Sequence, residues 1–453
     1  MRSVHVTRGR LLRGLTALVV GTATVGVAAG PAVAQDDPGW VSAWLDDVTV
    51  GGPGAPGRTV PLTLTSTGAT QPRVTVDLTG LAGVATAVFP AFCVTEGSAV
   101  SCPMPSTAVD EFGTLTGTVP VVFRAAPGAT DGATGTLAYT ALGEQTEPAT
   151  QQATITVRSG PDLRDLVDEY VSGVAVGDTV PVPVAVVNAG DQPVVDLRLT
   201  MSFSVGLVPA SYRNCRYGTN QSLATVMVCT VRGTFAPGQR HELRQKLTTT
   251  VGPATLGSKR ITQFVEPLAS AGPLPNGVKL KPREAGQGLR LRPVGKPLDV
   301  IPAGVTGAGG QTYLRSVQGA FDVVAQGATV TGAVGDTVRV TVGLRNAGPG
   351  VPDATISGDG VGGFLFVPPA GTTVLGNPSG CWLSGDEETA GDAPTTWYCT
   401  GPGAVFPAGT SHTVAFDLRI DSLSGLPGEV QPSQRYPRVD DNPGNDVAAV
   451  TVG

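Results

Sequence analysis

The sequence predicts an all-β protein made of tandem β-sandwich domains. Its 453 residues include 62 glycines and 38 prolines, which is the composition of many short strands joined by turns. The phrase VGDTVRVTVGLRNAGPG, residues 334–350, alternates apolar and polar residues and then breaks into turn residues. Residues 176–192, VGDTVPVPVAVVNAGDQ, repeat it almost unchanged. Because the chain is too long for one compact all-β unit, we expect one sandwich for each copy of this phrase.

The first 34 residues have the features of a secretory signal peptide. They contain four arginines and no acidic residue, followed by an apolar stretch and by small residues at Ala32 and Ala34 before Gln35. The apolar stretch is short and glycine-rich for a membrane span, and a retained N-terminal anchor is the alternative. No later run reaches the ~18 apolar residues of a transmembrane helix. We therefore expect a secreted, extracellular chain without a transmembrane segment.

Four landmarks recur in the same order after each copy of the phrase, whose third and degraded copy is GRTVPLTLTSTGAT at 57–70. They are an apolar segment ending in proline, a pair of cysteines, a proline–glycine turn and a closing strand rich in Val, Thr and Leu. The turns are AAPGAT (125–130), FAPGQ (235–239) and FPAGT (406–410). Self-similarity of this kind indicates repeated domains. We predict sandwiches at 35–160, 161–295 and 296–453, with 296–312 as a linker.

The alternating strand of each copy is expected to bury one face, because every second side chain of a strand points the same way. In the third copy the buried face comprises Val338, Val340, Val342 and Leu344, with Arg339, Thr341 and Arg345 nearer to solvent. The second copy contains Pro181 and Pro183. Since proline cannot donate a ladder hydrogen bond, this strand is predicted to lie at a sheet edge, at least at its start.

Two further predictions concern local structure. Residues 162–171, DLRDLVDEYV, have the apolar spacing of a helical turn, but they are too short and isolated to indicate an α/β fold. Trp40 and Trp44 lie where the first strand is expected and are predicted to be core residues of that strand.

The six cysteines fall into three close pairs separated by long stretches without cysteine. The pairs are Cys93 and Cys102, Cys215 and Cys229, and Cys381 and Cys399. An even number of cysteines in an exported chain suggests disulfides, and the simplest connectivity joins near neighbours. A zinc site would require CxxC spacings and histidines, which do not accompany these cysteines. We predict three local disulfides and no cofactor.

Charge is distributed unevenly along the chain. Residues 1–34 hold four of the 30 basic residues and none of the 36 acidic ones, so the rest is acidic, which disfavours nucleic acid as a partner. Residues 161–296 instead hold 16 basic and 10 acidic residues. The candidate ligand-binding residues of this part are Lys279, Lys281, Arg283, Arg290 and Arg292. Three interpretations stay open: a contact between domains, binding of anionic wall polymers such as teichoic acids, and a solvated face without a partner.

The sequence contains no recognisable catalytic motif, and we expect no enzymatic activity. His241 and His412 each follow a proline–glycine turn at matching places, as expected of strand residues rather than general bases. No GxSxG elbow, HExxH, P-loop, or GxGxxG in a strand–helix setting occurs. The densest acidic cluster lies inside the third cysteine pair and is interpreted as a solvated hairpin tip. Its carboxylates are also weak calcium candidates: Asp386, Glu387, Glu388 and Asp392.

Three aromatic residues flank the third cysteine pair, in a chain that is only 5% aromatic. They are Trp382, Trp397 and Tyr398. The rings either pack over the disulfide or form an exposed platform that stacks on sugars or on a protein partner. A third interpretation is that one tryptophan does each.

The repeated phrase, the cysteine pair, the FAPG turn and the ending DDNPGNDVAAVTV from Asp440 resemble the immunoglobulin-like repeats of bacterial surface proteins. The relatives are the conserved-repeat and CARDB (cell-adhesion-related) domains of exported actinobacterial proteins. The resemblance implies a sandwich that serves as a spacer or display module on the cell envelope. It carries over no catalytic residue, and the matching motif residues have structural roles. These are Asn188, Gly190, Asn346, Gly348 and Asn442.

We therefore expect an exported, non-enzymatic scaffold or adhesion protein of the cell envelope, whose partners are envelope polymers or surface proteins. The alternative is a carbohydrate- or anionic wall-polymer-binding protein that uses the aromatic hairpin of the third domain or the basic segment 279–296. A hydrolase with an unfamiliar carboxylate pair is the third hypothesis.

Overall fold

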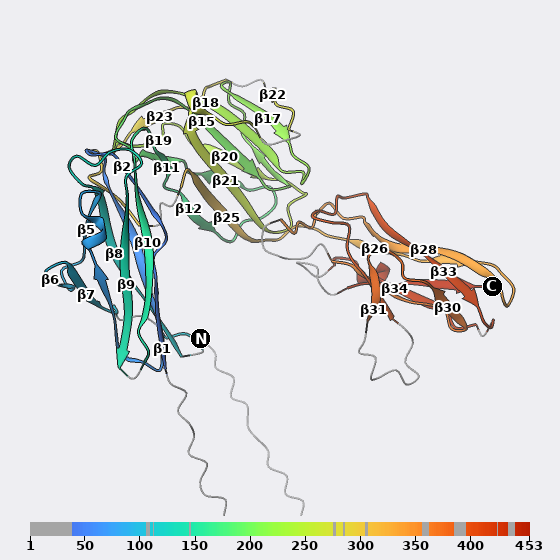
Figure 1. Cartoon of the computed structure of the whole chain (residues 1–453). Helices are drawn as coiled ribbons and strands as arrows, with labels where there is room; N and C mark the ends of the chain where they lie inside the picture. Colours follow the sequence, from blue (N-terminus) through green and yellow to red (C-terminus); the bar gives the residue numbers. More distant parts are fainter. Residues whose placement is uncertain are drawn as a thin grey trace, which may run out of the picture. The chain divides into compact units, whose positions relative to one another are not determined.

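The computed structural model (Figure 1) describes residues 39–105, 109–111, 113–144, 146–274, 278–283, 286–303, 307–355, 362–384, 396–423, 425–433 and 440–453. The predicted signal peptide at 1–34 lies outside these residues. The described regular structure is β-strand apart from the 3₁₀ turns η1 (Thr79–Leu81), η2 (Leu268–Ser270) and η4 (Pro443–Asn445). The predicted all-β class with tandem immunoglobulin-like sandwiches is confirmed. None of the described helical segments is long and apolar enough to cross a membrane.

The first sandwich encloses one buried cluster between two sheets. Its strands are β1 (Trp40–Trp44), β2 (Val48–Gly51), β3 (Gly57–Thr67), β4 (Thr70–Asp77), β5 (Ala85–Val88), β6 (Val94–Glu96), β7 (Ala99–Pro103), β8 (Thr114–Ala125), β9 (Thr134–Glu144) and β10 (Ala149–Arg158). One sheet has the order β1-β3-β8-β5 and the other β2-β10-β9-β4-β7-β6. Leu62, Leu64 and Phe123 from the first sheet are buried with Leu137 and Ile155 from the second. Each sheet thus hides one face, as the alternating pattern requires.

The second sandwich has one long sheet and two shorter ones. Its strands are β11 (Leu163–Asp165), β12 (Asp168–Val171), β13 (Thr179–Val182), β14 (Ala185–Asn188), β15 (Val194–Phe203), β16 (Leu207–Pro209), β17 (Cys215–Thr219), β18 (Thr225–Phe235), β19 (Arg240–Leu243), β20 (Leu247–Val251), β21 (Gly257–Pro267), β22 (Lys281–Pro282), β23 (Leu291–Pro293) and β25 (Gly309–Val317). The long sheet has the order β12-β25-β21-β15-β18-β17-β22, and the short ones are β11-β14-β19-β23 and β13-β20-β16. Strand β13, which contains Pro181, pairs only with β20. The predicted edge position at the start of this copy is confirmed.

The third sandwich again has two sheets around a cluster of its own, to which Leu256 from the segment before β21 also belongs. Its strands are β26 (Val323–Gln326), β27 (Ala328–Val330), β28 (Thr337–Asn346), β29 (Phe364–Val367), β30 (Thr372–Leu375), β31 (Cys381–Ser384), β32 (Thr396–Cys399), β33 (Ser411–Ile420), β34 (Gly428–Pro432) and β35 (Ala448–Val452). The sheets have the orders β26-β28-β33-β30 and β27-β35-β34-β29-β32-β31. In β28 the side chains of Val340, Val342 and Leu344 are buried, and those of Arg339 and Arg345 are exposed. The predicted faces of this strand are confirmed, with Val338 half-buried near its start.

The asparagine of the repeated phrase ties its strand to the proline–glycine turn. The side-chain nitrogen Nδ2 of Asn346 donates to the carbonyl oxygens of Gly350 (2.9 Å) and Phe406 (2.7 Å). In the second sandwich, Nδ2 of Asn188 donates to the carbonyl oxygens of Gln192 (2.7 Å) and Phe235 (2.9 Å). Because Phe235 and Phe406 begin the two turns, one side chain holds two turns in each sandwich.

The first copy departs from this arrangement. The residue that matches the asparagines is Ser66, whose buried Oγ has no hydrogen-bond partner among the described residues. Its strand β3 pairs with β8, which precedes the turn at 125–130. The corresponding partners β19 and β33 instead follow their turns. The turn at 125–130 therefore does not match the other two in position, although it too leads into a strand.

The strand pairing corrects the predicted boundary between the second and third sandwiches. The strand β24 (Val300–Ile301) pairs in parallel with β3 of the first sandwich. Strand β25 pairs with β21 and β12 of the second sandwich, whose core includes Leu314 and Val317. Residues 296–312 are therefore not a free linker, and the second sandwich continues past 295 to Val317. The sequence could not show this, because both partners lie far away along the chain.

Two local predictions were wrong. Residues 162–171 form the strands β11 and β12 rather than a helical turn, since their backbone groups pair with β14 and β25. Trp40 and Trp44 are 47% and 45% exposed, so they are not core residues. They do lie on β1, but the residues that alternate inward there are Val41 and Ala43. The two-residue period of a strand shows which residues of β1 share a face, but which of the two faces is buried depends on the register of the strand.

Candidate functional site

The three predicted local disulfides are present. They join Cys93 to Cys102, Cys215 to Cys229, and Cys381 to Cys399. The second bridge links directly opposite residues of β17 and β18, and the third links those of β31 and β32. These two bridges therefore each fix a hairpin, and the two hairpins carry the candidate binding residues.

The two tryptophans of the third hairpin differ in how far they are buried. Trp397 is 4% exposed and packs edge-on against Phe416, with ring centroids 5.9 Å apart. Trp382 is 52% exposed and lies 4.7 Å from the ring of Tyr398. Alternation along β31 and β32 accounts for the difference, because opposite residues pair as Trp382 with Tyr398 and Leu383 with Trp397. One tryptophan packs inward and the other offers a surface, which was the third interpretation.

The calcium candidates Asp386, Glu387, Glu388 and Asp392 lie outside the described residues. Within the part of the chain that is described, no group of three or more His, Cys, Asp or Glu side chains is placed to hold a metal ion.

Both histidines are strand residues, as predicted. His241 lies on β19, is 6% exposed and packs against the ring of Phe235, with centroids 4.6 Å apart. Its burial lowers its pKa, and the contact of Nδ1 with the carbonyl oxygen of Gln239 opposes that shift. His412 lies on β33 with Nε2 2.9 Å from the carbonyl oxygen of Thr400. Each imidazole contacts a backbone carbonyl, and neither contact involves a nucleophile or a carboxylate.

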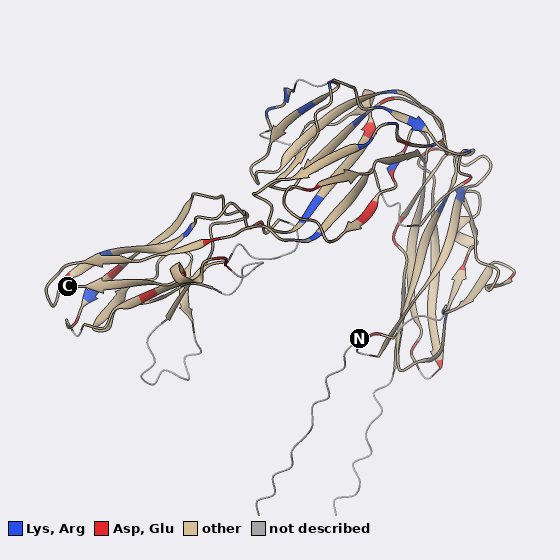
Figure 2. Ribbon diagram, turned by 180° about the vertical axis from the view of Figure 1, so that it is seen from behind, with Lys and Arg blue, Asp and Glu red and all other residues tan. Residues whose placement is uncertain are grey.

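The basic segment folds onto the second hairpin. Lys281 lies on β22, which pairs with β17, and Arg292 lies on β23. The guanidinium of Arg283 stands 4.3 Å from the ring centroid of Tyr217, a cation–π distance. Lys279 and Arg290 are exposed. Figure 2 shows basic residues in blue on several strands and loops of this sandwich.

The structure adds three arginines that the sequence analysis did not single out. Arg213, Arg216 and Arg232 line the same cavity of about 790 Å³ as Arg290. Arg213 and Arg216 lie on either side of Cys215 in the stretch YRNCRYG. Their position beside a disulfide cysteine could have indicated them from the sequence. The third comes from the far end of β18, and only strand pairing brings it alongside. This cavity is the strongest candidate site of the described residues.

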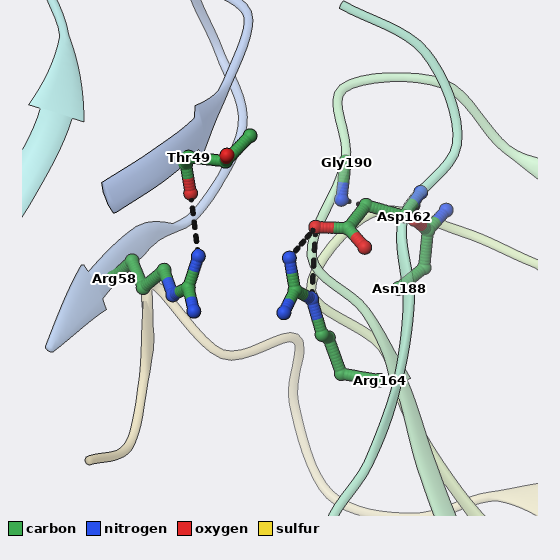
Figure 3. A network of polar contacts seen from close by, with 6 residues as sticks. All are labelled: Thr49, Arg58, Asp162, Arg164, Asn188 and Gly190. Carbon is green, nitrogen blue, oxygen red and sulfur yellow. Dashed lines mark hydrogen bonds and ion pairs between the residues drawn. The ribbon is translucent and has the colours of Figure 1, made fainter. Parts of the chain in front are cut away.

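Two sets of local polar contacts, one around Asp162 and one around Arg58, are drawn in Figure 3. Nε and Nη2 of Arg164 donate to one carboxylate oxygen of Asp162, at 2.9 and 2.7 Å. Arg58 donates to the carbonyl oxygen of Thr49 at 2.7 Å. Burial and the charge of Arg164 lower the pKa of Arg58, and Asp162 opposes the shift. Since these guanidiniums are already hydrogen-bonded within the chain, these contacts are structural.

Comparison with known proteins gives no family. No family model matches the chain, and no curated protein matches it. Among solved structures, the Dpr2 Ig1–Ig2 complex with DIP-Theta Ig1–Ig3 covers 91% of this chain and 99% of its own, at 9% identity and a TM-score of 0.24. Titin domains I67–I69, in an E-to-A mutated variant, cover 92% and 99% at 8% identity and 0.17. The titin I9–I11 tandem covers 91% and 98% at 10% identity and 0.16. The fold of this chain is shown by its own strand pairing.

Proposed function

We propose that the protein is an exported, non-enzymatic scaffold or adhesion protein of the bacterial cell envelope, of the conserved-repeat and CARDB kind. The observation that carries the proposal is the set of separate sandwich cores, each with its own disulfide. Disulfides of this kind form and persist in oxidising compartments outside the cytosol. A series of sandwiches suits a spacer or display role, because the strands supply a stable frame and the loops remain open to partners.

The signal-peptide features of residues 1–34 support the same compartment. The test is labelling of intact producing cells with a membrane-impermeant biotin reagent, followed by recovery of the chain. Labelling comparable to that of a known envelope protein is expected. Recovery of an unlabelled chain from the cytosol alone would overturn the proposal.

A second candidate function is carbohydrate binding by the hairpin of the third sandwich. The observation that favours it is the exposed indole of Trp382 beside Tyr398, since paired aromatic faces stack on sugar rings. The variant Trp382→Ala should lose retardation in gels that contain purified wall polysaccharide. Trp44→Ala is the matched control, because Trp44 is nearly as exposed on another sandwich. Equal retardation of both variants, or none in the unaltered chain, would remove this candidate.

A further inference from the structure

The second sandwich contains an open cavity whose charged lining is entirely basic. Its volume is about 790 Å³, and its lining combines a hairpin, the end of β18 and the loop before β23. The charged residues of the lining are Arg213, Arg216, Arg232 and Arg290. The remaining lining residues are neutral. Arginine stays protonated at any physiological pH, so the lining presents permanent positive charge.

The walls of this cavity are held firmly by the chain itself. The disulfide between Cys215 and Cys229 joins the strands that form one wall. Asn214 connects that wall to the opposite loop: its Nδ2 donates to the carbonyl oxygens of Thr230 (2.7 Å) and Leu289 (3.0 Å), and its Oδ1 accepts from the Leu289 amide (2.6 Å). The arginines therefore project from a frame that is already formed, which lowers the ordering cost of binding.

Most of the positive charge is not neutralised within the described residues. Arg232 forms an ion pair with Asp196 at 2.5 Å, and Arg216 donates to the carbonyl oxygen of Leu280 at 3.2 Å. Among the residues that the structure describes, neither Arg213 nor Arg290 forms an ion pair with a carboxylate. One carboxylate thus accompanies four guanidiniums, and an anion bound from solution can neutralise the remaining positive charge.

The chemistry of the lining favours phosphate groups. A guanidinium presents a planar fork of N–H donors that matches the oxygens of a phosphate, and such charge-assisted bonds are the strong ones. A single phosphate can accept hydrogen bonds from only a few of these guanidiniums at once. Further basic side chains lie beyond the cavity. These are Lys281, Arg283 and Arg292, of which Arg283 is positioned over Tyr217. A chain of phosphates would use both the cavity and its continuation.

We propose that the arginine-lined cavity of the second sandwich binds a phosphodiester-linked polymer, with Arg213 and Arg290 as the principal ligands. The proposal deepens the envelope function and rests on it, because a polymer of this class must be met outside the cell. Nucleic acid is the competing phosphodiester. The signal-peptide features of residues 1–34 favour a wall polymer over nucleic acid, because they direct the chain to the compartment where wall polymers lie.

The test uses the mature chain from Gln35 and a fluorescently labelled poly(glycerol phosphate) oligomer, with binding followed by anisotropy. The double variant Arg213→Gln/Arg290→Gln should bind at least about 10-fold more weakly, a change of ~1.4 kcal/mol in binding free energy, because it removes two charge-assisted hydrogen-bonding groups. Arg73→Gln/Arg345→Gln removes the same charge from exposed sites on the other sandwiches and should leave affinity within about twofold. The double variant Arg213→Lys/Arg290→Lys should recover only part of the loss, because lysine keeps the charge but lacks the planar fork of N–H donors.

Each outcome decides the proposal. Excess inorganic phosphate should compete weakly, and affinity should fall steeply with added salt. Equal losses in the two Gln variants would mean bulk attraction without a site. Tighter binding of a duplex DNA probe than of the glycerol phosphate oligomer would assign the cavity to nucleic acid instead. No binding by the unaltered chain would also overturn the cavity, while surface labelling of intact cells would still decide the envelope function independently.

Discussion

At the scale of single residues, the clearest feature is the asparagine that recurs in the repeated phrase. Asn188 and Asn346 each bridge two backbone carbonyls, whereas Ser66 at the matching position bridges none among the described residues. The residue types of the phrase indicated turns. Which turn the asparagine would hold depends on a strand pairing across some 60 residues, which no local pattern reveals.

The contrast gives a matched pair of variants. Asn346→Ala should lower the free energy of unfolding of the third sandwich by about 1–3 kcal/mol, because the carbonyls of Gly350 and Phe406 lose their donor in a buried site. Ser66→Ala should not lower the stability of the first sandwich, because it removes a buried hydroxyl that has no hydrogen-bond partner among the described residues. Urea unfolding followed by tryptophan fluorescence and circular dichroism measures both. A comparable loss in the two variants would contradict the role given to Asn346.

Asp165 should make stability depend on pH. This carboxyl is 4% exposed, and burial raises its pKa from 3.8 to about 7 despite hydrogen bonds from the Val167 amide and the Gln263 side chain. A raised folded-state pKa means that the native state holds the proton more tightly than the unfolded chain. Its contribution is therefore fully present below the unfolded pKa and is lost as the pH rises through about 7.

The variant Asp165→Asn should accordingly be more stable than the unaltered chain above pH ~7, by on the order of 2–4 kcal/mol. The two should converge near pH ~4, where the carboxyl is neutral in the folded state. Asp168→Asn is the control, because Asp168 is exposed three residues further on. Parallel pH–stability curves for the unaltered chain and Asp165→Asn would show that the carboxyl is not desolvated.

At the scale of elements, the sequence predicted strands, faces and disulfides well but placed some side chains wrongly. The faces of β28 followed from alternation, and the cysteine pairs followed from spacing alone. Trp40 and Trp44 were assigned to the core because large aromatics are usually buried, yet the register of β1 turns Val41 and Ala43 inward. The arginine-lined cavity was only partly predicted, because its four arginines come from segments that are up to 77 residues apart. Pairing of β17 with β18 brings three of them together, and hydrogen bonds between Asn214 and Leu289 hold the segment of Arg290 beside them.

The disulfide hairpin of the second sandwich offers a test at this scale. Replacing Cys215 and Cys229 together by serine should lower the free energy of unfolding by about 2–4 kcal/mol, since the unfolded chain regains the freedom of the closed loop. The same change should weaken polymer binding, because Cys215 lies in the lining of the cavity. Calorimetry of the oxidised chain and the variant gives the stability difference. An unchanged transition would mean that the bridge does not restrain the unfolded chain.

At the scale of the whole molecule, the limits of the sandwiches along the chain differ from those that the sequence repeats predict. Strand β25 completes the long sheet of the second sandwich, and its Leu314 and Val317 belong to that core. A fragment of residues 161–318 should therefore unfold cooperatively. A fragment of residues 161–295, cut at the limit that the repeated landmarks suggest, should unfold at lower denaturant and expose its core to a hydrophobic dye. Identical transitions for the two fragments would restore the earlier boundary.

The proposed function requires an exported chain whose sandwiches each carry a local disulfide. Both features can be read from one measurement, which is non-reducing peptide mapping by mass spectrometry of the protein recovered from the cell surface or medium of producing cells. We expect an N-terminus at Gln35 and three local bridges, Cys93 to Cys102, Cys215 to Cys229 and Cys381 to Cys399. A chain found only inside the cell, beginning at Met1 and carrying free thiols, would contradict it.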